Sequence, residues 1–574
     1  MQLIQSEQRE RNNVFPAWTL PPTWLKSLII VLVCLGLFFR FANLDGKIYW
    51  YDETHTSLRV SGYTEAEAVQ ALSNNQITSI QDLQKYQRPN PERGVTDIVK
   101  HFASEDAQHP PLFYLLMRFW MQWFGSSVAA ARSLSALLSL LAFPCIYWLC
   151  LELYKSPLVG WMAVAMLAVS PIHVLYAQEA RQYSFWTVTI LLASAALLRA
   201  IRRNTKVSWG IYAATAALSL YTFLFSGLVL IGHGIYVVVT EKFRFSKTTI
   251  AYLVASLSAL VAFTPWIIAV TGSLSRIGKT TAWTTNKLTL STLIREWILI
   301  VDRIFVDWNY PTDDRPISKL LFYLTSVIIL GILAYSVYFL CRHTPKEVWL
   351  FNLALIGSTG LTLMLSDLMF GGMRSTIGRY LFPYYLGIQL TVVYFLSAKL
   401  TGVFANIKQQ KFWQAIAIAI ISGGVVSCAI SSQADVWWTK YQNQCLPEIA
   451  RIINQATHPL LISDTQTGDL LALSYRLDPK VGLLIEPLCT NCGVTYPSRV
   501  EPNIKIPQEF SDIFFFNLDG QDKWIQTLAH AQGYKVEPIN LISRKSENLL
   551  WKLHQVRPNT LHVSIPNTSE SKQL

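Results

Sequence analysis

The sequence predicts a polytopic α-helical membrane protein with a smaller soluble α/β domain near its C-terminal end. Hydrophobic residues make up 52% of the 574 residues and charged residues only 15%, whereas a soluble domain has about 25% charged residues. Apolar stretches of roughly 18 residues or more, long enough to cross a bilayer, recur between residues 25 and 432. Beyond them the apolar runs are shorter and charge is more frequent. We therefore expect a tail at 1–24, a membrane domain at 25–432, a soluble domain at 433–560 and a disordered tail at 561–574.

The positions of Lys and Arg predict which loops face the cytoplasm, because cytoplasmic loops carry an excess of both. With the N-terminus inside, the pattern predicts about eleven spans and an extracytoplasmic C-terminal domain. The expected spans are 25–44, 131–153, 158–176, 184–198, two within 209–240, 250–270, one ending at 343, 348–365, one ending near 399, and 412–431. The clearest cytoplasmic signal is the basic run at 199–206.

One short apolar segment, residues 109–125, decides this topology. It is too short for a full span, and Arg118 and Gln122 fall four residues apart on one helical face. A helix of this kind fits the plane of the membrane interface. If it crossed the membrane, every later loop would change sides and the basic loops would lie outside. We therefore expect it to lie flat within an outer loop covering 45–130.

The soluble domain is predicted from alternating strand and helix patterns. Residues 459–464, 481–485 and 512–516 have the pattern of buried strands, and residues near 445–456 and 521–532 that of helices. Outside the cytoplasm, Cys489 and Cys492 are suited to a disulfide, with Cys445 as an alternative partner and a redox role left open. The net charge of +12 fits the basic cytoplasmic loops, and no nucleic-acid-binding motif is present, so no nucleic-acid partner is expected.

Four polar clusters fall on the same, outer side in this topology. They are Asp52-Glu53-Thr-His55 after the first span, His109-Pro-Pro, Glu179-Ala-Arg181-Gln-Tyr183 between the third and fourth spans, and Arg379-Tyr380 before the tenth. Ionisable groups at a membrane boundary are costly to desolvate and mark functional sites. Acidic groups beside several arginines suit a base and a binder of an anionic lipid such as a lipid phosphate.

The order of these motifs resembles the GT-C glycosyltransferases over residues 25–400. The resemblance is strongest to the family 39-like and 83-like branch, which contains protein O-mannosyltransferases and the bacterial aminoarabinose transferase of lipid A. It rests on Arg40-x-x-x-Leu44 with Tyr51-Asp52-Glu53, on His109-Pro-Pro-Leu-Phe-Tyr114, on Ser170-Pro171 followed by Tyr176-Ala-Gln-Glu179-Ala-Arg181-Gln-Tyr183, and on Arg379-Tyr-Leu-Phe-Pro383. The resemblance implies inverting transfer of a sugar from a polyprenyl-phosphate donor to a lipid, glycan or protein acceptor. It also implies a bacterial inner-membrane location with an extracytoplasmic active site.

The resemblance also implies roles for individual residues. Asp52 would be the general base, and Glu179 a second acidic group that orients the acceptor or a metal. The candidates for binding the donor phosphate are Arg181, Arg379, Arg40 and Arg132, and the other site residues are His109, Tyr183 and Tyr380. Glu53 is left open between a metal ligand, a positioning group and a solvated neighbour. A divalent metal is likewise open, with His55, His109 and Glu53 as candidate ligands.

Two other classes of function compete with a transferase. A transporter or lipid flippase would place ionisable groups near the middle of broken helices, often within inverted repeats, whereas here the charges gather at one face and no repeat is found. A membrane-anchored scaffold would leave the charged outer loops without a role. The alternative, non-catalytic interpretations of the motifs are a solvated Asp-Glu pair, a structural Glu179–Arg181 ion pair and ordinary interfacial tyrosines. The sequence names neither the sugar, the acceptor nor the carrier lipid.

Overall fold

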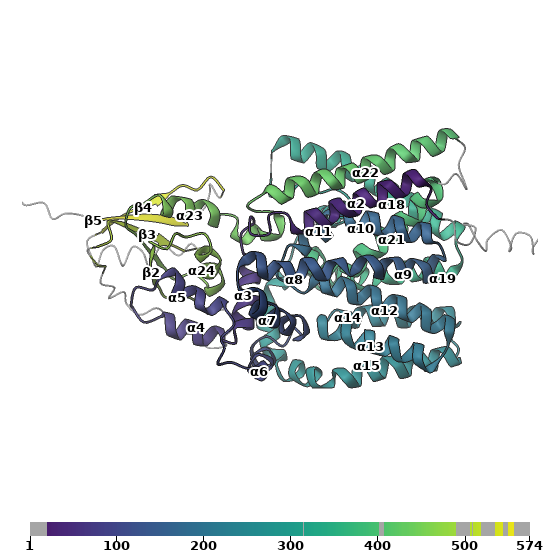
Figure 1. The fold of residues 1–574 in the computed structure, drawn as a ribbon, viewed down its shortest axis with the longest axis horizontal. Coiled ribbons are helices and arrows are strands. Elements are labelled where there is room, and N and C mark those ends of the chain that lie inside the picture. The colour runs from purple at the N-terminus through teal and green to yellow at the C-terminus, as the bar shows by residue number, and fades with distance from the viewer. Residues whose placement is uncertain are drawn as a thin grey trace, which may run out of the picture.

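The structure is a computed structural model that describes residues 20–313, 315–400, 407–489, 506–507, 509–517, 534–543 and 549–555. It is a long helical bundle with a small sheet domain at one end (Figure 1). The bundle helices are α2 (Thr23–Phe41), α8 (Val128–Leu140), α9 (Ala142–Tyr154), α10 (Pro157–Ala168), α11 (Pro171–Ala177), α12 (Tyr183–Arg203), α13 (Lys206–Thr222), α14 (Ser226–Thr240), α15 (Lys247–Gly272), α18 (Pro316–His343), α19 (Lys346–Ile356), α20 (Thr362–Phe370), α21 (Phe382–Leu400) and α22 (Ile407–Gln433).

Each apolar segment expected to span the membrane coincides with one of these helices or with a consecutive pair. Within the described part of the chain, seven helices are long and apolar enough to cross a bilayer, or eight if the bent pair α10–α11 is counted as one span. The helices α13 and α14 are shorter than a full crossing requires. The polytopic helical fold is therefore confirmed, while the count of about eleven crossings stays a prediction.

The bend between α10 and α11 measures 60° and lies at Ser170-Pro171. A proline at the start of α11 lacks the N–H that would continue the ladder of α10, which leaves carbonyls without a helical partner. The guanidinium of Arg40 supplies the missing donors: Nη1 donates to Ala168 O at 2.6 Å and Nη2 to Leu167 O at 3.1 Å. Arg40 thereby ties the end of α2 to the break in its neighbour.

Short helices cap the end of the bundle that faces the sheet domain (Figure 1). They are α3 (Tyr51–Ser61), α4 (Glu65–Leu72), α5 (Ile80–Gln84), α6 (Val95–Glu105) and α7 (Leu112–Phe124). Two further short helices, α16 (Leu274–Thr280) and α17 (Leu290–Asp302), follow α15 in the chain. The end of α2 and the start of α8 lie together, because Arg132 Nη1 donates to Leu44 O at 2.6 Å. The chain between α2 and α8 therefore starts and ends at the same end of the bundle.

Helix α7, which we expect to lie flat in the interface with Arg118 and Gln122 on its wet face, differs from this expectation at one residue. Its apolar face exposes Phe119, Trp123 and Phe124, as an interfacial helix would. Gln122 is exposed, but Arg118 is buried instead of lying on a wet face with it. Its guanidinium donates to the carbonyls of Val60, Ser61, Asn90 and Arg93, so it holds the outer loop together.

The C-terminal domain is an α/β domain, as the sequence predicts. It contains η6 (Trp438–Asn443), α23 (Leu446–Asn454), β1 (Pro459–Ser463), α24 (Thr467–Ser474), β2 (Gly482–Ile485), β3 (Asp512–Phe516), β4 (Tyr534–Ile539) and β5 (Leu550–Gln555). The strand order is β2-β1-β3-β5-β4, with β1 parallel to β2 and β3, and β5 antiparallel to β3 and β4. Cys489 is disulfide-bonded, whereas Cys492, the expected helix at 521–532 and the tail at 561–574 lie outside the described residues.

The sheet domain and the outer helices share one hydrophobic core. Trp50 and Leu58 of the outer loop pack in the same buried cluster as Leu446, Leu471 and Phe514 of the domain. Thr78 also pairs with Leu483 of β2 through backbone hydrogen bonds. This common core fixes the domain against α3, which carries Asp52 and Glu53.

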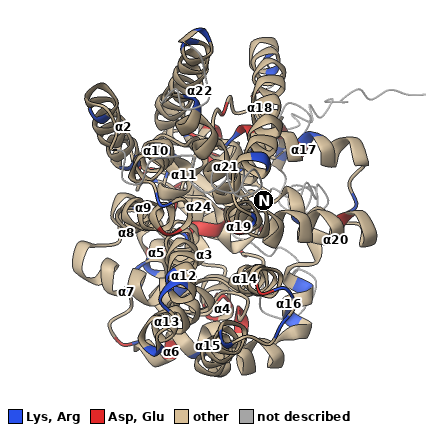
Figure 2. Ribbon diagram, turned by 90° about the vertical axis from the view of Figure 1, so that its right-hand side faces the viewer, with Lys and Arg blue, Asp and Glu red and all other residues tan. Residues whose placement is uncertain are grey.

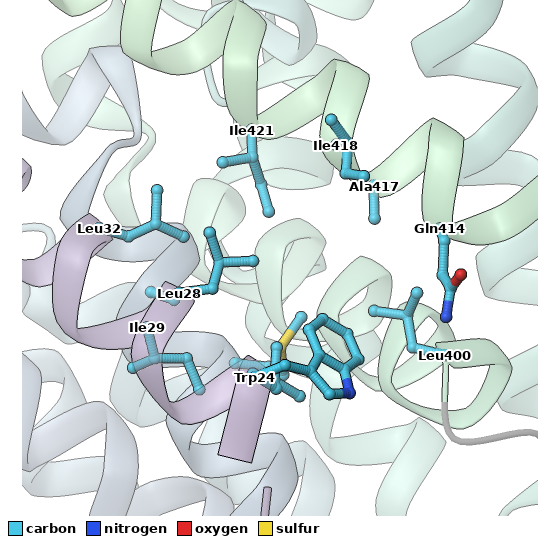
Figure 3. A pocket seen from close by; sticks show the side chains of 12 residues that line it. Trp24, Leu28, Ile29, Leu32, Leu400, Gln414, Ala417, Ile418 and Ile421 are labelled. Atoms are coloured by element: carbon cyan, nitrogen blue, oxygen red, sulfur yellow. The ribbon is translucent and has the colours of Figure 1, made fainter. Parts of the chain in front are cut away.

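A cavity of about 430 Å³ opens between α2, α10, α21 and α22 (Figure 3). Its lining residues are Trp24, Leu25, Leu28, Ile29, Leu32, Met162, Ala165, Leu400, Gln414, Ala417, Ile418 and Ile421. Residues 24–32 belong to the first half of α2, whereas Asp52 follows the other end of that helix. The lining carries no acidic or basic side chain, so the polar motifs singled out in the sequence lie elsewhere, at the opposite end of the bundle.

Candidate active site

Helix α3 presents Asp52 and Glu53 in its first turn, where the positive end of the helix dipole favours carboxylates. The helix starts after Trp50, whose backbone N–H donates to Glu53 Oε2 at 3.4 Å, and it ends at Gly62 with φ of 92°, a conformation that favours glycine. The two neighbours differ in exposure. The Glu53 side chain is 0% exposed, while that of Asp52 is 18% exposed.

Glu53 is held inside the protein by two cations. Arg132 binds it in a bidentate manner, with Nε to Oε1 at 2.8 Å and Nη2 to Oε2 at 2.7 Å. Lys440 Nζ lies 3.0 Å from Oε2, and the Ala180 N–H donates to Oε1 at 2.8 Å. Burial alone would raise the pKa of Glu53, but Arg132 and Lys440 together lower it to about 2. Glu53 is therefore ionised and fully engaged within the fold.

Glu179 lies on the other side of the same lysine. Its side chain is 0% exposed, and Lys440 Nζ lies 3.3 Å from Oε1. Burial, with a contribution from the charge of Glu53, raises the pKa of Glu179 although Lys440 opposes the shift. Sequence reasoning missed Lys440, because it follows α22 in a stretch without a motif. The structure thus joins two predicted acidic residues through a cation from the edge of the C-terminal domain.

Asp52 faces a partly exposed arginine. Arg379 Nη1 lies 3.4 Å from Asp52 Oδ2, and the Arg379 side chain is 20% exposed. Aromatic rings surround its guanidinium: the ring centroids of Trp283, Tyr380 and Trp50 lie 5.7, 5.8 and 6.0 Å away. Burial would raise the pKa of Asp52, but Arg379 and then Arg181 hold it below its usual value. Asp52 is therefore a carboxylate at neutral pH.

Arg181 connects Asp52 to His109. Nη1 donates to the Asp52 carbonyl at 3.2 Å and to Thr56 Oγ1 at 3.0 Å, and Nη2 donates to His109 Nε2 at 3.1 Å and to Tyr183 Oη at 3.4 Å. Since the guanidinium can only donate, His109 Nε2 accepts, and its Nδ1–H donates to an Asp106 carboxylate oxygen 2.9 Å away. Burial lowers the pKa of His109, so the ring is neutral in this network.

The remaining predicted residues fall into two groups. Tyr183 and Tyr380 lie at the site, beside Arg181 and Arg379 respectively. Arg40 lies apart from the others: besides the carbonyls at the helix break, it binds Gly36 O and Ser139 Oγ. Arg132 is close to Glu53, but its remaining donors bind the carbonyls of Leu44, Lys47 and Ile48.

The candidate metal ligands do not form a metal site. Among the described residues, no three His, Cys, Asp or Glu side chains gather closely enough to hold an ion. The oxygens of Glu53 accept from Arg132 and Lys440, and His109 Nε2 accepts from Arg181. His55 Nδ1 lies 3.0 Å from Tyr51 O, and its Nε2 is 3.9 Å from Glu65. Because the lone pairs of Glu53 and His109 face guanidinium or ammonium groups, these two residues do not fit as ligands of a divalent cation.

Comparison with known proteins bears on the family and the fold of the chain. A family model described as dolichyl-phosphate-mannose-protein mannosyltransferase matches residues 108–268. The chain is similar to the crystal structure of ArnT from Cupriavidus metallidurans bound to undecaprenyl phosphate, with a TM-score of 0.50, 12% identity and coverage of 93% of this chain and 98% of that one. It is also similar to the oligosaccharyltransferase of Archaeoglobus fulgidus, with a TM-score of 0.43, 12% identity and coverage of 81% and 64%. No curated protein matches the chain.

These findings confirm the resemblance to the GT-C superfamily and the expected fold class. The fold is similar to that of ArnT, and the family model that matches residues 108–268 describes a mannosyltransferase. The matched family segment contains five of the predicted site residues, namely His109, Arg132, Glu179, Arg181 and Tyr183.

Proposed function

We propose that this chain transfers a sugar from a polyprenyl-phosphate donor to an extracytoplasmic acceptor with inversion, and that Asp52 is the general base. The observation that carries the proposal is the difference among the three acidic residues. Asp52 is 18% exposed and lies 3.4 Å from a partly exposed arginine, whereas Glu53 and Glu179 are 0% exposed and bind Lys440. Only Asp52 is placed to touch a substrate among these three.

The chemistry needs one base and a stabilised anionic leaving group. Asp52 would accept the proton of an acceptor O–H or N–H as that atom forms a bond to the anomeric carbon of the sugar. The bond from this carbon to the phosphate oxygen breaks at the same time, and its electron pair leaves with the polyprenyl phosphate. Attack from the face opposite the phosphate inverts the anomeric configuration. Arginine donors would stabilise the charge on the departing phosphate.

The four arginine candidates are not equivalent for the phosphate. Arg379 is the first choice because it is partly exposed beside Asp52. Arg181 is the second choice because it donates to the backbone carbonyl of Asp52. Arg40 and Arg132 donate to groups of the fold itself. We assign them structural roles, and we assign Glu53 the role of a positioning group.

The placement of charge supports an extracytoplasmic site. Helix α12 begins at Tyr183 beside the site and ends at Arg202 and Arg203, and α21 begins after Arg379 and ends at Lys399. Figure 2 shows the end of the bundle remote from the sheet domain, where Lys and Arg mark several helix ends. By the positive-inside rule this end is cytoplasmic. We therefore propose that the site and the C-terminal domain, with limits near 433 and 560, lie on the extracytoplasmic side of the membrane. In a bacterium this membrane would be the inner membrane.

A transfer assay tests the proposed function. The purified full-length protein in lipid nanodiscs would be given polyprenyl-phosphate sugars, each with a panel of lipid, glycan and peptide acceptors. We expect one donor to release free polyprenyl phosphate in step with a glycosylated acceptor, whose anomeric configuration by NMR is opposite to that of the donor. Retained configuration, or cleavage of nucleotide sugars in place of lipid-linked ones, would contradict the proposal.

A further inference from the structure

Lys440 lies at the centre of a buried charge cluster. Its Nζ is 3.0 Å from Glu53 Oε2 and 3.3 Å from Glu179 Oε1, and all three side chains are 0% exposed. The ring of Trp50 covers it, with the centroid 5.4 Å from Nζ. An ammonium group so far from water is tolerated only when opposite charges surround it.

The other cations of the cluster, Arg132 and Lys47, bind groups other than Glu179. Arg132 divides its donors between Glu53 and three loop carbonyls. Lys47 Nζ donates to Gln178 Oε1 at 3.0 Å, and burial lowers its pKa to about 7. Among the described residues, Lys440 is therefore the cation that contacts both carboxylates, and it offsets the negative charge of the buried Glu179.

The two carboxylates belong to the two segments that build the site. Glu53 follows Asp52 in α3, and Glu179 lies two residues before Arg181 in the loop between α11 and α12. Lys440 itself is fixed from a third direction, because the indole N–H groups of Trp437 and Trp438 both donate to Asp307 Oδ2 at 2.7 Å. The short helix η6 thus places one charged side chain between α3 and the loop that joins α11 to α12.

We propose that Lys440 is a positioning residue: by bridging Glu53 and Glu179 it sets the base Asp52 at the distance from Arg181 and Arg379 that transfer requires. This inference rests on the proposed function. It also gives the start of the C-terminal domain a direct part in the active site, although Lys440 does not reach the substrate. A cation is required at this position, and an apolar side chain of equal length cannot replace it.

The kinetic test compares Lys440→Met, which removes the charge, with Lys440→Arg, which keeps it. The matched control is Lys399→Met, because Lys399 is also buried but lies over the Phe339 ring at the far end of α21. At saturating substrates we expect kcat to fall on the order of tenfold to a hundredfold in Lys440→Met, with the KM for the donor little changed, and to recover substantially in Lys440→Arg. Wild-type kcat in Lys440→Met, or equal losses in the Met and Arg variants, would overturn the proposal.

A second measurement does not depend on any enzymatic activity. Without Lys440, the folded-state pKa of Glu179 lies further above its unfolded-state pKa. The contribution of Glu179 to folding stability is then fully present below the unfolded-state pKa and is lost as the pH rises through the folded-state pKa. The Tm deficit of Lys440→Met relative to wild type should therefore be larger at pH 8 than at pH 5. Adding Glu179→Gln to Lys440→Met should restore Tm at pH 8. A pH-independent deficit refutes charge bridging, whereas failure of every donor in the transfer assay refutes only the proposed transferase activity.

Discussion

Asp52 is the residue on which the proposed chemistry depends most directly. Asp52→Asn keeps the shape of the side chain but cannot accept a proton, so we expect transfer to fall by about a hundredfold or more. The matched control is Asp45→Asn, an exposed aspartate seven positions earlier in the same outer loop. The measurement is kcat/KM for both variants, together with binding of the polyprenyl-phosphate donor. If Asp52→Asn transfers sugar as fast as the control, another group is the base.

The ion pair between Asp52 and Arg379 predicts how the rate depends on pH. Arg379 is the nearest cation that holds the pKa of Asp52 below its usual value. Replacing Arg379 by Gln removes that charge, so the pKa of Asp52 rises and a smaller fraction is ionised at any acidic pH. The acidic limb of the kcat profile at saturating donor should therefore move to higher pH. An unmoved limb with a lower plateau would mean that Arg379 acts on the donor alone.

Sequence reasoning singled out residues that lie in motifs and missed a partner that lies in none. Asp52, Arg181 and Arg379 lie in motifs beside predicted spans, and the structure brings them together. The bridge from Glu53 to Lys440 could not be predicted, because the two residues are 387 positions apart and a lone lysine in a polar segment carries no pattern. Whether an acidic residue faces substrate or a buried cation depends on tertiary contacts, which periodicity does not encode.

At the scale of elements, the broken helix α10–α11 gives Arg40 a role that can be separated from phosphate binding. Arg40→Met leaves the carbonyls of Leu167 and Ala168 without their donor, and each such buried group costs about 1–3 kcal/mol. We expect a clear drop in Tm while the folded fraction keeps the donor KM of wild type. Lys26→Met, at an exposed position of the same helix α2, is the control. A raised KM for the donor at unchanged Tm would indicate that Arg40 binds the donor phosphate and would contradict a purely structural role.

The elements themselves were predictable where hydrophobic runs are long. The membrane helices and the strands β1, β2 and β3 follow apolar segments, and the structure has them close to the expected limits. The strands β4 and β5 were not predicted. The β4 sequence Tyr-Lys-Val-Glu-Pro-Ile is partly exposed along its length and contains a proline, so it lacks the apolar run of a buried strand. It becomes a strand because β5 pairs with it at the edge of the sheet.

At the scale of the whole molecule, the sheet domain packs against the first turn of α3, next to the candidate active site. Thr54 Oγ1 donates to Gly468 O at 3.0 Å, the Tyr51 N–H donates to Asn443 Oδ1 at 2.8 Å, and Asn443 Nδ2 donates to Asp469 Oδ1 at 2.7 Å. The start of α24 therefore touches the turn of α3 that carries Asp52. A domain attached in this way acts on the geometry of the site in addition to any role in choosing the acceptor.

Gly468 lets the two parts approach this closely, and it supplies the test. A Cβ at position 468 would lie 2.5 Å from His55 Cε1 and 2.7 Å from Tyr51 Cδ2, so Gly468→Ala must displace α24 from α3 or distort the first turn of α3. Overpacking of this kind typically costs about 1–3 kcal/mol, and a shift of about 1 Å in a catalytic group can lower the rate on the order of a hundredfold. Gly210→Ala in α13, where the added Cβ meets nothing within 4 Å, is the control. We expect kcat to fall in Gly468→Ala and not in Gly210→Ala, by more than the loss of folded protein explains. If both variants turn over like wild type, the sheet domain does not set the position of Asp52, and its contribution must lie elsewhere than in the geometry of α3.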